Sequence, residues 1–230
     1  MVRQTKSSTL AGQVHDQIRR DILRGEIKPG TRLQPPRLAG HYATSTTVIR
    51  EALTRLSTES IVVNHPQRGF FVQELSIPEL NGLTLVRKHA DALALRLAIE
   101  KGDLEWESSV VTAHHVLQRT PRRESDNPQH TTEAWSEAHR SFHSALISAC
   151  GIPTLQRLSQ ELFDSTELYR RWTAPFEQPT NRDIEREHSE ILEAVIARDA
   201  DRAVAVLCNH YQLSHDIIIE TGLVREEDRA

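Results

Sequence analysis

The chain has 230 residues, of which 38% are hydrophobic and 26% charged, values typical of a globular protein. No apolar run approaches the roughly 20 residues needed to span a bilayer, and the first ten residues, MVRQTKSSTL, contain no signal-peptide core. Residues 1–75 carry 11 Lys and Arg against 6 Asp and Glu (+5), and residues 76–230 carry 17 against 26 (−9), which gives the net charge of −4. We therefore expect a cytoplasmic protein, not associated with a membrane, with a basic and an acidic domain that have different partners.

The first 75 residues are predicted to form three helices followed by a β-hairpin. Apolar residues recur every four positions in the first segment, at Leu10, Val14, Ile18 and Ile22. A short second helix begins near Pro35, and Ser45 is a suitable N-cap for a third helix. Residues 61–63 and 70–73 are predicted strands on either side of the turn NHPQRG. This order is typical of a winged helix-turn-helix, whose third helix reads the major groove of DNA.

Several side chains of this domain are candidates for contact with double-stranded DNA. The third helix begins with three hydroxyl side chains, and Arg50, one turn later, can pair with a phosphate or with guanine. A glycine at the tip of the wing lets the backbone approach DNA closely. The candidate DNA-binding residues are Arg32, Arg37, Ser45, Thr46, Thr47, Arg50, Gln67, Arg68 and Gly69.

The remainder of the chain shows only helical periodicity. Residues 76–80 are predicted to be a linker, and residues 81–230 an antiparallel helical bundle. The expected helices span residues 79–101, 103–119, 132–150, 153–172, 181–198 and 200–221. The predicted fold class is therefore mainly α, with an N-terminal winged helix-turn-helix that contains a small β-hairpin.

Four histidines of the predicted bundle lie on apolar helix faces. At about 100° per residue, His139 and His143 fall roughly 40° and 80° from Trp135, on one edge of the apolar stripe. His188 and His210 lie among aliphatic residues on two later helices. Four inward imidazoles are costly to bury unless their ring nitrogens have partners, and a divalent metal provides one partner for all of them. A hydrogen-bonded cavity without a metal is the alternative.

The first domain resembles a known family. The stretches LRGEIKPGTRL, LAGHYATSTTVIREALTRLSTESIVV and QRGFFV resemble the GntR superfamily of bacterial transcription regulators. The helical domain resembles the effector domain, called FCD, of the FadR-type branch. The resemblance implies a homodimer on a pseudo-palindromic operator, controlled by a small molecule in the helical domain, and we expect a repressor. Thr46 and Val48 replace an arginine and a proline common in the family, so the operator sequence cannot be transferred.

The resemblance extends to the histidines. One subset of FCD domains binds a metal through Asp-x3-His on one helix and one histidine on each of two later helices. His143, His188 and His210 match these histidines, whereas His139 stands where the family usually has aspartate. The resemblance thus implies an all-imidazole metal site, for which we expect zinc, with nickel or manganese as alternatives. Because a negative ligand is missing, such a metal is more electropositive and favours an anionic effector.

Arg87 is the main candidate for binding that effector. It lies near the inward arc of its helix, where FCD domains often place an arginine close to the effector, although an i,i+4 ion pair with Asp91 is the alternative. Arg170 is a second candidate. A metal together with arginine suits a small carboxylate.

Two other functional hypotheses remain. In a metal sensor the ion itself is the signal, whereas a metalloenzyme needs a general base beside the metal-bound water. Glu187 and Glu190 flank His188, but their helical angles turn them away from the apolar stripe, and no HExxH, nucleophile elbow or P-loop is present. The sequence therefore predicts a regulator and not an enzyme.

Overall fold

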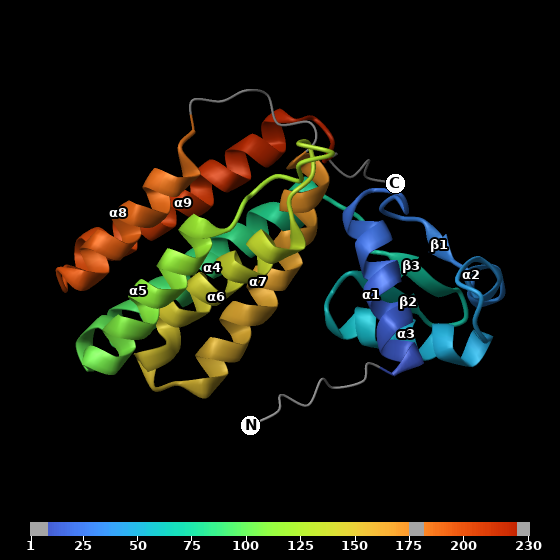
Figure 1. The fold of residues 1–230 in the computed structure, drawn as a ribbon, viewed down its shortest axis with the longest axis horizontal. Helices are drawn as coiled ribbons and strands as arrows, with labels where there is room; N and C mark the ends of the chain where they lie inside the picture. The colour runs from blue at the N-terminus through green and yellow to red at the C-terminus, as the bar shows by residue number, and fades with distance from the viewer. Residues whose placement is uncertain (1–8, 175–181, 225–230) are drawn as a thin grey trace. The chain divides into compact units, whose positions relative to one another are not determined.

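The computed structural model describes residues 9–174 and 182–224, and the chain divides into two compact units, Met1–Leu75 and Ser76–Ala230 (Figure 1). The described residues form nine α-helices, a short 3-10 helix (η1, Ser148–Cys150) and one small antiparallel sheet, which confirms the predicted fold class. Within these residues, no helix combines the length and the apolar character that crossing a bilayer requires.

In the first unit, the residues described from position 9 onward form three helices and a three-stranded sheet. Its helices are α1 (Leu10–Leu23), α2 (Pro35–His41) and α3 (Thr46–Thr58), and its strands are β1 (Arg32–Leu33), β2 (Val62–His65) and β3 (Gly69–Val72). The sheet order is β1-β3-β2, and β1 is a strand that the sequence did not predict. Two residues are too short for a period-2 pattern, and Leu33 pairs with Phe70 only through the tertiary fold. Apolar side chains of α1 and α3 form the core, notably Ile18, Ile22, Ile49 and Leu53.

The described residues of the second unit form a bundle of six helices, which run roughly alongside one another in Figure 1. These helices are α4 (Ile77–Lys101), α5 (Leu104–Arg119), α6 (Glu133–Ile147), α7 (Pro153–Thr173), α8 (Ile184–Ile196) and α9 (Ala200–Glu220). α4 packs against α6, α7 and α9, while α8 packs against α5 and α9. The helices that carry the four histidines, α6, α8 and α9, therefore surround a shared interior.

Residues 76–80, predicted as a linker, are the N-cap and first turn of α4 instead. Ser76 Oγ accepts a hydrogen bond from the backbone N–H of Glu79, and Pro78 occupies the first turn, where its missing N–H has no cost. The helix predicted over residues 132–150 ends earlier than expected. α6 stops at Ile147, the chain then tightens into η1, and Gly151, with a φ of 74°, ends η1.

Candidate metal centre and DNA-binding surface

The four predicted histidines come together in the interior of the helical unit. Each offers a ring nitrogen, and these four atoms all lie within 4.8 Å of one another. His139 Nε2 and His143 Nε2 are 3.0 Å apart, and the rings of His188 and His210 have centroids separated by 4.7 Å. All four residues are buried, with exposed fractions of 2–6%.

Local capping sets the rotation of the helices that present these rings. Thr132 Oγ1 accepts from the N–H of Trp135 at the start of α6, and Asp183 and Asp199 cap α8 and α9 in the same way. With α6 begun at Glu133, His139 and His143 lie one turn apart and point to the same side. The ring of Trp135 stacks on His139, with centroids 4.6 Å apart and planes at 15°, so His139 is held in place by its own helix.

The imidazoles of the cluster are neutral near pH 7. Burial, together with the charge of its neighbours, lowers the pKa of His139, His143 and His188 well below the usual value. Burial also lowers the pKa of His210, to about 4, although a hydrogen bond to Glu187 opposes the effect. A metal ligand must be a neutral imidazole, so the cluster is poised to bind rather than to repel a cation.

The unsatisfied atoms of the cluster fit a metal ion. His188 Nε2 is buried and has no hydrogen-bond partner among the described residues, which is a costly arrangement for a ring nitrogen. Two imidazole nitrogens that bind one zinc ion at about 2.0–2.1 Å are roughly 3 Å apart. The separation of 3.0 Å between the Nε2 atoms of His139 and His143 agrees with that spacing.

Both predicted effector-binding arginines line a cavity that borders the histidines. This cavity is lined by Arg87, Arg170, His139 and His210 among others. Arg87 donates to Thr166 Oγ1 at 3.2 Å and pairs with Asp91 at 3.4 Å, so the inward position and the i,i+4 ion pair occur together. Arg87 Nη2 is buried with no partner among the described residues. Arg170 donates to the same Thr166 hydroxyl at 2.8 Å, so the two guanidinium groups converge.

The expectation that Glu187 faces away from the site is wrong. Glu187 Oε2 accepts from Nδ1–H of His210 at 2.7 Å, and Arg182 donates to both carboxylate oxygens at 2.7 Å. The expectation rested on the helical angle between Glu187 and the apolar face of α8 alone. α9 packs along the flank of α8 and brings His210 to Glu187. Burial opposes ionisation of Glu187, but its hydrogen bonds with Arg182 and His210 outweigh burial and lower its pKa to about 2.

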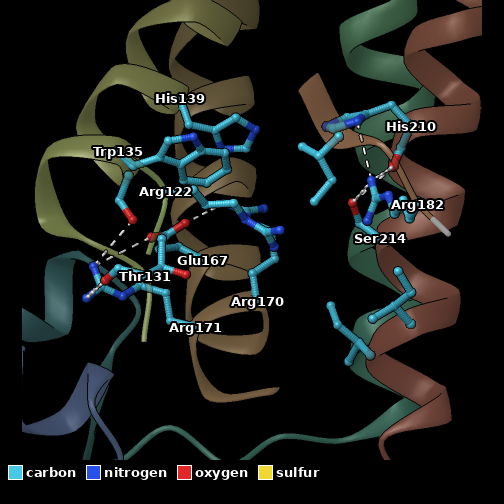
Figure 2. A pocket seen from close by; sticks show the side chains of 14 residues that line it. Arg122, Thr131, Trp135, His139, Glu167, Arg170, Arg171, Arg182, His210 and Ser214 are labelled. Carbon is cyan, nitrogen blue, oxygen red and sulfur yellow. Dashed lines mark hydrogen bonds and ion pairs between the residues drawn. The ribbon is translucent and has the colours of Figure 1, made fainter. Parts of the chain in front are cut away.

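Sequence reasoning also missed Arg182 as a part of the site. Figure 2 shows Arg182 beside His210 and Ser214, and Trp135 against His139, among the residues that line a second cavity. Arg171, on the same wall, pairs with Glu133 at 2.6 Å and belongs to the ion-pair network of α6 and α7. No periodicity signals Arg182, because it precedes the first turn of α8.

The predicted DNA-binding residues lie at the surface of the first unit, on α2, α3, β1 and the β2–β3 hairpin. The side chains of Thr46, Thr47 and Arg50 on α3 are exposed, as are those of Arg32 on β1 and Arg37 on α2. Ser45 is the N-cap of α3, and its Oγ accepts from Val48 N–H at 3.3 Å. At the wing, Gln67 and Gly69 have φ values of 62° and 93°, and Arg68 lies over the ring of Phe71. The hairpin turn thus depends on two left-handed residues.

A winged helix-turn-helix followed by a helical bundle with a buried polar cavity defines a DNA-binding regulator with an effector domain. Two family models match the chain: "Bacterial regulatory proteins, gntR family" over residues 10–72 and "FCD domain" over residues 83–213. The chain therefore belongs to the GntR family of DNA-binding transcriptional regulators and carries an FCD effector domain.

Relatives of known sequence agree with this assignment. The HTH-type transcriptional regulator BphR of Paraburkholderia xenovorans is 36% identical over 90% of this chain and 84% of its own. The HTH-type transcriptional repressor GlaR of Escherichia coli is 30% identical over 84% of this chain and 88% of its own. Among solved structures, Escherichia coli McbR/YncC superposes with a TM-score of 0.69 at 22% identity, over 93% of this chain and 99% of its own, and thus shares the fold. These relatives are regulators and not enzymes.

Proposed function

We propose that the protein is a metal-containing repressor whose binding to operator DNA is controlled by a small carboxylate. The observation that carries the proposal is the cluster of four buried histidines, whose ligand atoms lie within 4.8 Å of one another beside two arginines. Buried polar groups normally have partners, and a divalent cation is the partner that suits four neutral imidazoles.

The metal ligands in this proposal are His139, His143, His188 and His210. Zinc is the ion we expect, with nickel or manganese as alternatives, since imidazole suits each of them. A bound ion would supply Lewis acidity, through which it attracts an anionic oxygen. Because His139 replaces the usual aspartate, the four ligands carry no negative charge. The carboxylates of Glu187 and Asp91 are already paired with Arg182 and Arg87, so they do not offset the charge of the ion.

The effector in this proposal is a small carboxylate that binds the metal and the arginines Arg87 and Arg170. Arg87 Nη2 has no hydrogen-bond partner among the described residues. Arg87 and Arg170 both donate to the hydroxyl of Thr166, so their guanidinium groups lie close together. A carboxylate has two oxygens, which suit the fork of an arginine and a metal at once.

The first unit, residues 1–75, is the proposed DNA-binding domain, and the helical unit is the proposed effector domain. One winged helix covers about one half-site, so we propose a homodimer on a pseudo-palindromic operator. The repressor assignment is supported by the similarity to GlaR, which is a transcriptional repressor.

Elemental analysis of gently purified protein, followed by titration of operator binding, tests the proposal. We expect about one equivalent of metal per chain, and operator release on addition of small carboxylates only when the metal is present. Release by zinc alone, with no effect of any carboxylate, would favour the metal-sensor alternative. Protein that contains no metal, and whose operator binding does not change on addition of zinc, nickel or manganese, would refute the proposed metal site. A monomeric sedimentation mass on DNA would refute the dimer.

A further inference from the structure

One metal-ligand candidate, His210, is attached to a hydrogen-bonded chain that leads away from the cluster. His210 Nδ1 lies 2.7 Å from Glu187 Oε2, and Arg182 holds both oxygens of that carboxylate at 2.7 Å. Arg182 Nη2 also donates to the Ser214 hydroxyl at 3.0 Å and to the backbone oxygen of His210 at 3.2 Å (Figure 2). Arg182 and Glu187 thus connect α8 with the helix that carries His210.

The charges of this chain decide which nitrogen of His210 carries the proton. Arg182 Nη2 is 3.4 Å from Nδ1 and is itself a donor, whereas the carboxylate of Glu187 is closer and can only accept. Nδ1 must therefore be the protonated nitrogen. The other nitrogen, Nε2, keeps its lone pair, which is the form required of a metal ligand.

The other histidines lack such an arrangement. His143 Nδ1 meets the Tyr211 hydroxyl at 3.3 Å, and His139 Nδ1 is buried with no partner among the described residues. Across the described part of the chain, Glu187 is the one carboxylate that is hydrogen-bonded to an imidazole of the cluster. His210 is only 4% exposed, so a water molecule cannot readily take the place of Glu187 as its hydrogen-bond partner.

We infer that Glu187 is a positioning residue, which fixes the tautomer and ring orientation of His210, and that Arg182 holds Glu187 in place for this task. This inference rests on the proposed function in so far as it concerns metal affinity. The tautomer itself is a property of the metal-free protein. The two parts can therefore fail separately.

Nitrogen-15 NMR of the histidine rings tests the tautomer in the metal-free, full-length protein near pH 7. In the wild type we expect His210 to be protonated at Nδ1, with its signals assigned by their loss in His210→Phe. Glu187→Ala is expected to shift His210 toward the Nε2-protonated tautomer, while Glu187→Gln, which keeps an acceptor oxygen, retains more of the wild-type form. Glu190→Ala is the matched control, because Glu190 lies on the same helix, pairs with Arg186 and is partly exposed.

Competition with a chelator then measures metal affinity for the same variants. Glu187→Ala is expected to weaken zinc or cobalt binding by about 10- to 100-fold, the usual effect of removing such a partner. The visible spectrum of bound cobalt is expected to change as well, since the orientation of one ligand is lost. Glu190→Ala is expected to match the wild type in both measurements. Circular dichroism establishes that each variant remains helical.

The outcomes separate the two hypotheses. An unchanged His210 tautomer in a folded Glu187→Ala protein overturns the inference, whatever the metal affinity. The positioning role is also overturned if the tautomer changes but the metal affinity stays within twofold of the wild type and the cobalt spectrum is unchanged. A wild type that binds no metal refutes the proposed function, while a tautomer that depends on Glu187 still supports the hydrogen-bonded chain.

Discussion

Replacing His188 by leucine tests whether the polar interior of the helical unit is built for a metal. His188 is 2% exposed, and its Nε2 has no partner among the described residues. Leucine has a similar volume and no polar atom, so it removes a buried nitrogen whose desolvation costs about 1–3 kcal/mol. We therefore expect metal-free His188→Leu to be more stable than the metal-free wild type by about that amount.

Zinc is expected to invert this order. At a free zinc concentration of 100 times the Kd, a protein that binds only in its folded state gains about 2.7 kcal/mol. For a chain of this size, 1 kcal/mol moves the Tm by about 2–4 °C, so the wild type is expected to melt roughly 5–10 °C higher with zinc. His188→Leu lacks one of four ligands, and we expect most of that shift to be lost.

Tryptophan fluorescence is the appropriate readout of melting, because Trp106, Trp135 and Trp172 all belong to the helical unit. His115→Leu is the matched control, since His115 is an exposed histidine on α5 and its loss is expected to leave the zinc shift unchanged. A metal-free His188→Leu protein that is less stable than the wild type, with an undiminished zinc shift, would refute the reasoning.

Three further experiments address the DNA-binding unit and the acid sensitivity of the site. Arg50→Ala is expected to weaken operator binding by about 1–3 kcal/mol, measured by fluorescence anisotropy, and an unchanged affinity at moderate salt would remove Arg50 from the interface. The pKa of His210 falls from 6.5 in the unfolded chain to about 4 in the folded one, so the unfolded chain takes up its proton first. The free energy of unfolding of the metal-free protein should therefore fall by roughly 3 kcal/mol, from His210 alone, as the pH is lowered from 6.5 toward 4. Urea titrations measure this, and a free energy of unfolding that does not change over this pH range contradicts it. In the first unit, His15 bonds to Glu59 at 2.6 Å and to Asp16 at 2.8 Å, and the bond to Glu59, opposed by burial, raises its pKa. The stabilisation of the folded unit by the His15–Glu59 bond is therefore complete below pH 6.5 and is lost as the pH rises through the raised pKa. Glu59→Gln should speed hydrogen exchange in α1, relative to the wild type at the same pH, more at pH 6 than at pH 9. An equal effect at both pH values would refute this.

The sequence predicted those parts of the site that depend on one helix at a time. The phase of α6 follows from its cap at Thr132 and its apolar spacing, so the inward position of His139 and His143 could be derived locally. The same holds for His188 on α8 and His210 on α9. Their convergence on one point is a tertiary fact: the cost of burying four inward imidazoles suggested a shared metal, and the resemblance to FCD domains pointed to the same residues.

Contacts between neighbouring helices could not be predicted in this way. Glu187 points to the flank of α8, and only the packing of α9 on that flank makes it a partner of His210. Arg182 precedes α8 and has no periodic neighbours that would indicate its direction. Likewise, β1 has two residues and exists because β3 offers it a free edge. Partners of this kind depend on the lateral register of elements, which the pattern within one element does not encode.

The two arginines of the proposed effector site would also connect ligand binding with the fold. Arg87 belongs to α4 and Arg170 to α7, and both donate to the hydroxyl of Thr166, so a carboxylate that takes Arg87 Nη2 and Arg170 would bind beside this contact between α4 and α7. The same two helices are fixed to each other at Ser76, whose N–H donates to the hydroxyl of Tyr169 at 3.2 Å, and Tyr169 directly precedes Arg170. Ser76 is the first residue of the helical unit, joined by a peptide bond to the last residue of the DNA-binding unit. A ligand shifts an equilibrium only by interacting differently with its two states, and the α4–α7 contact is where this ligand would make that difference.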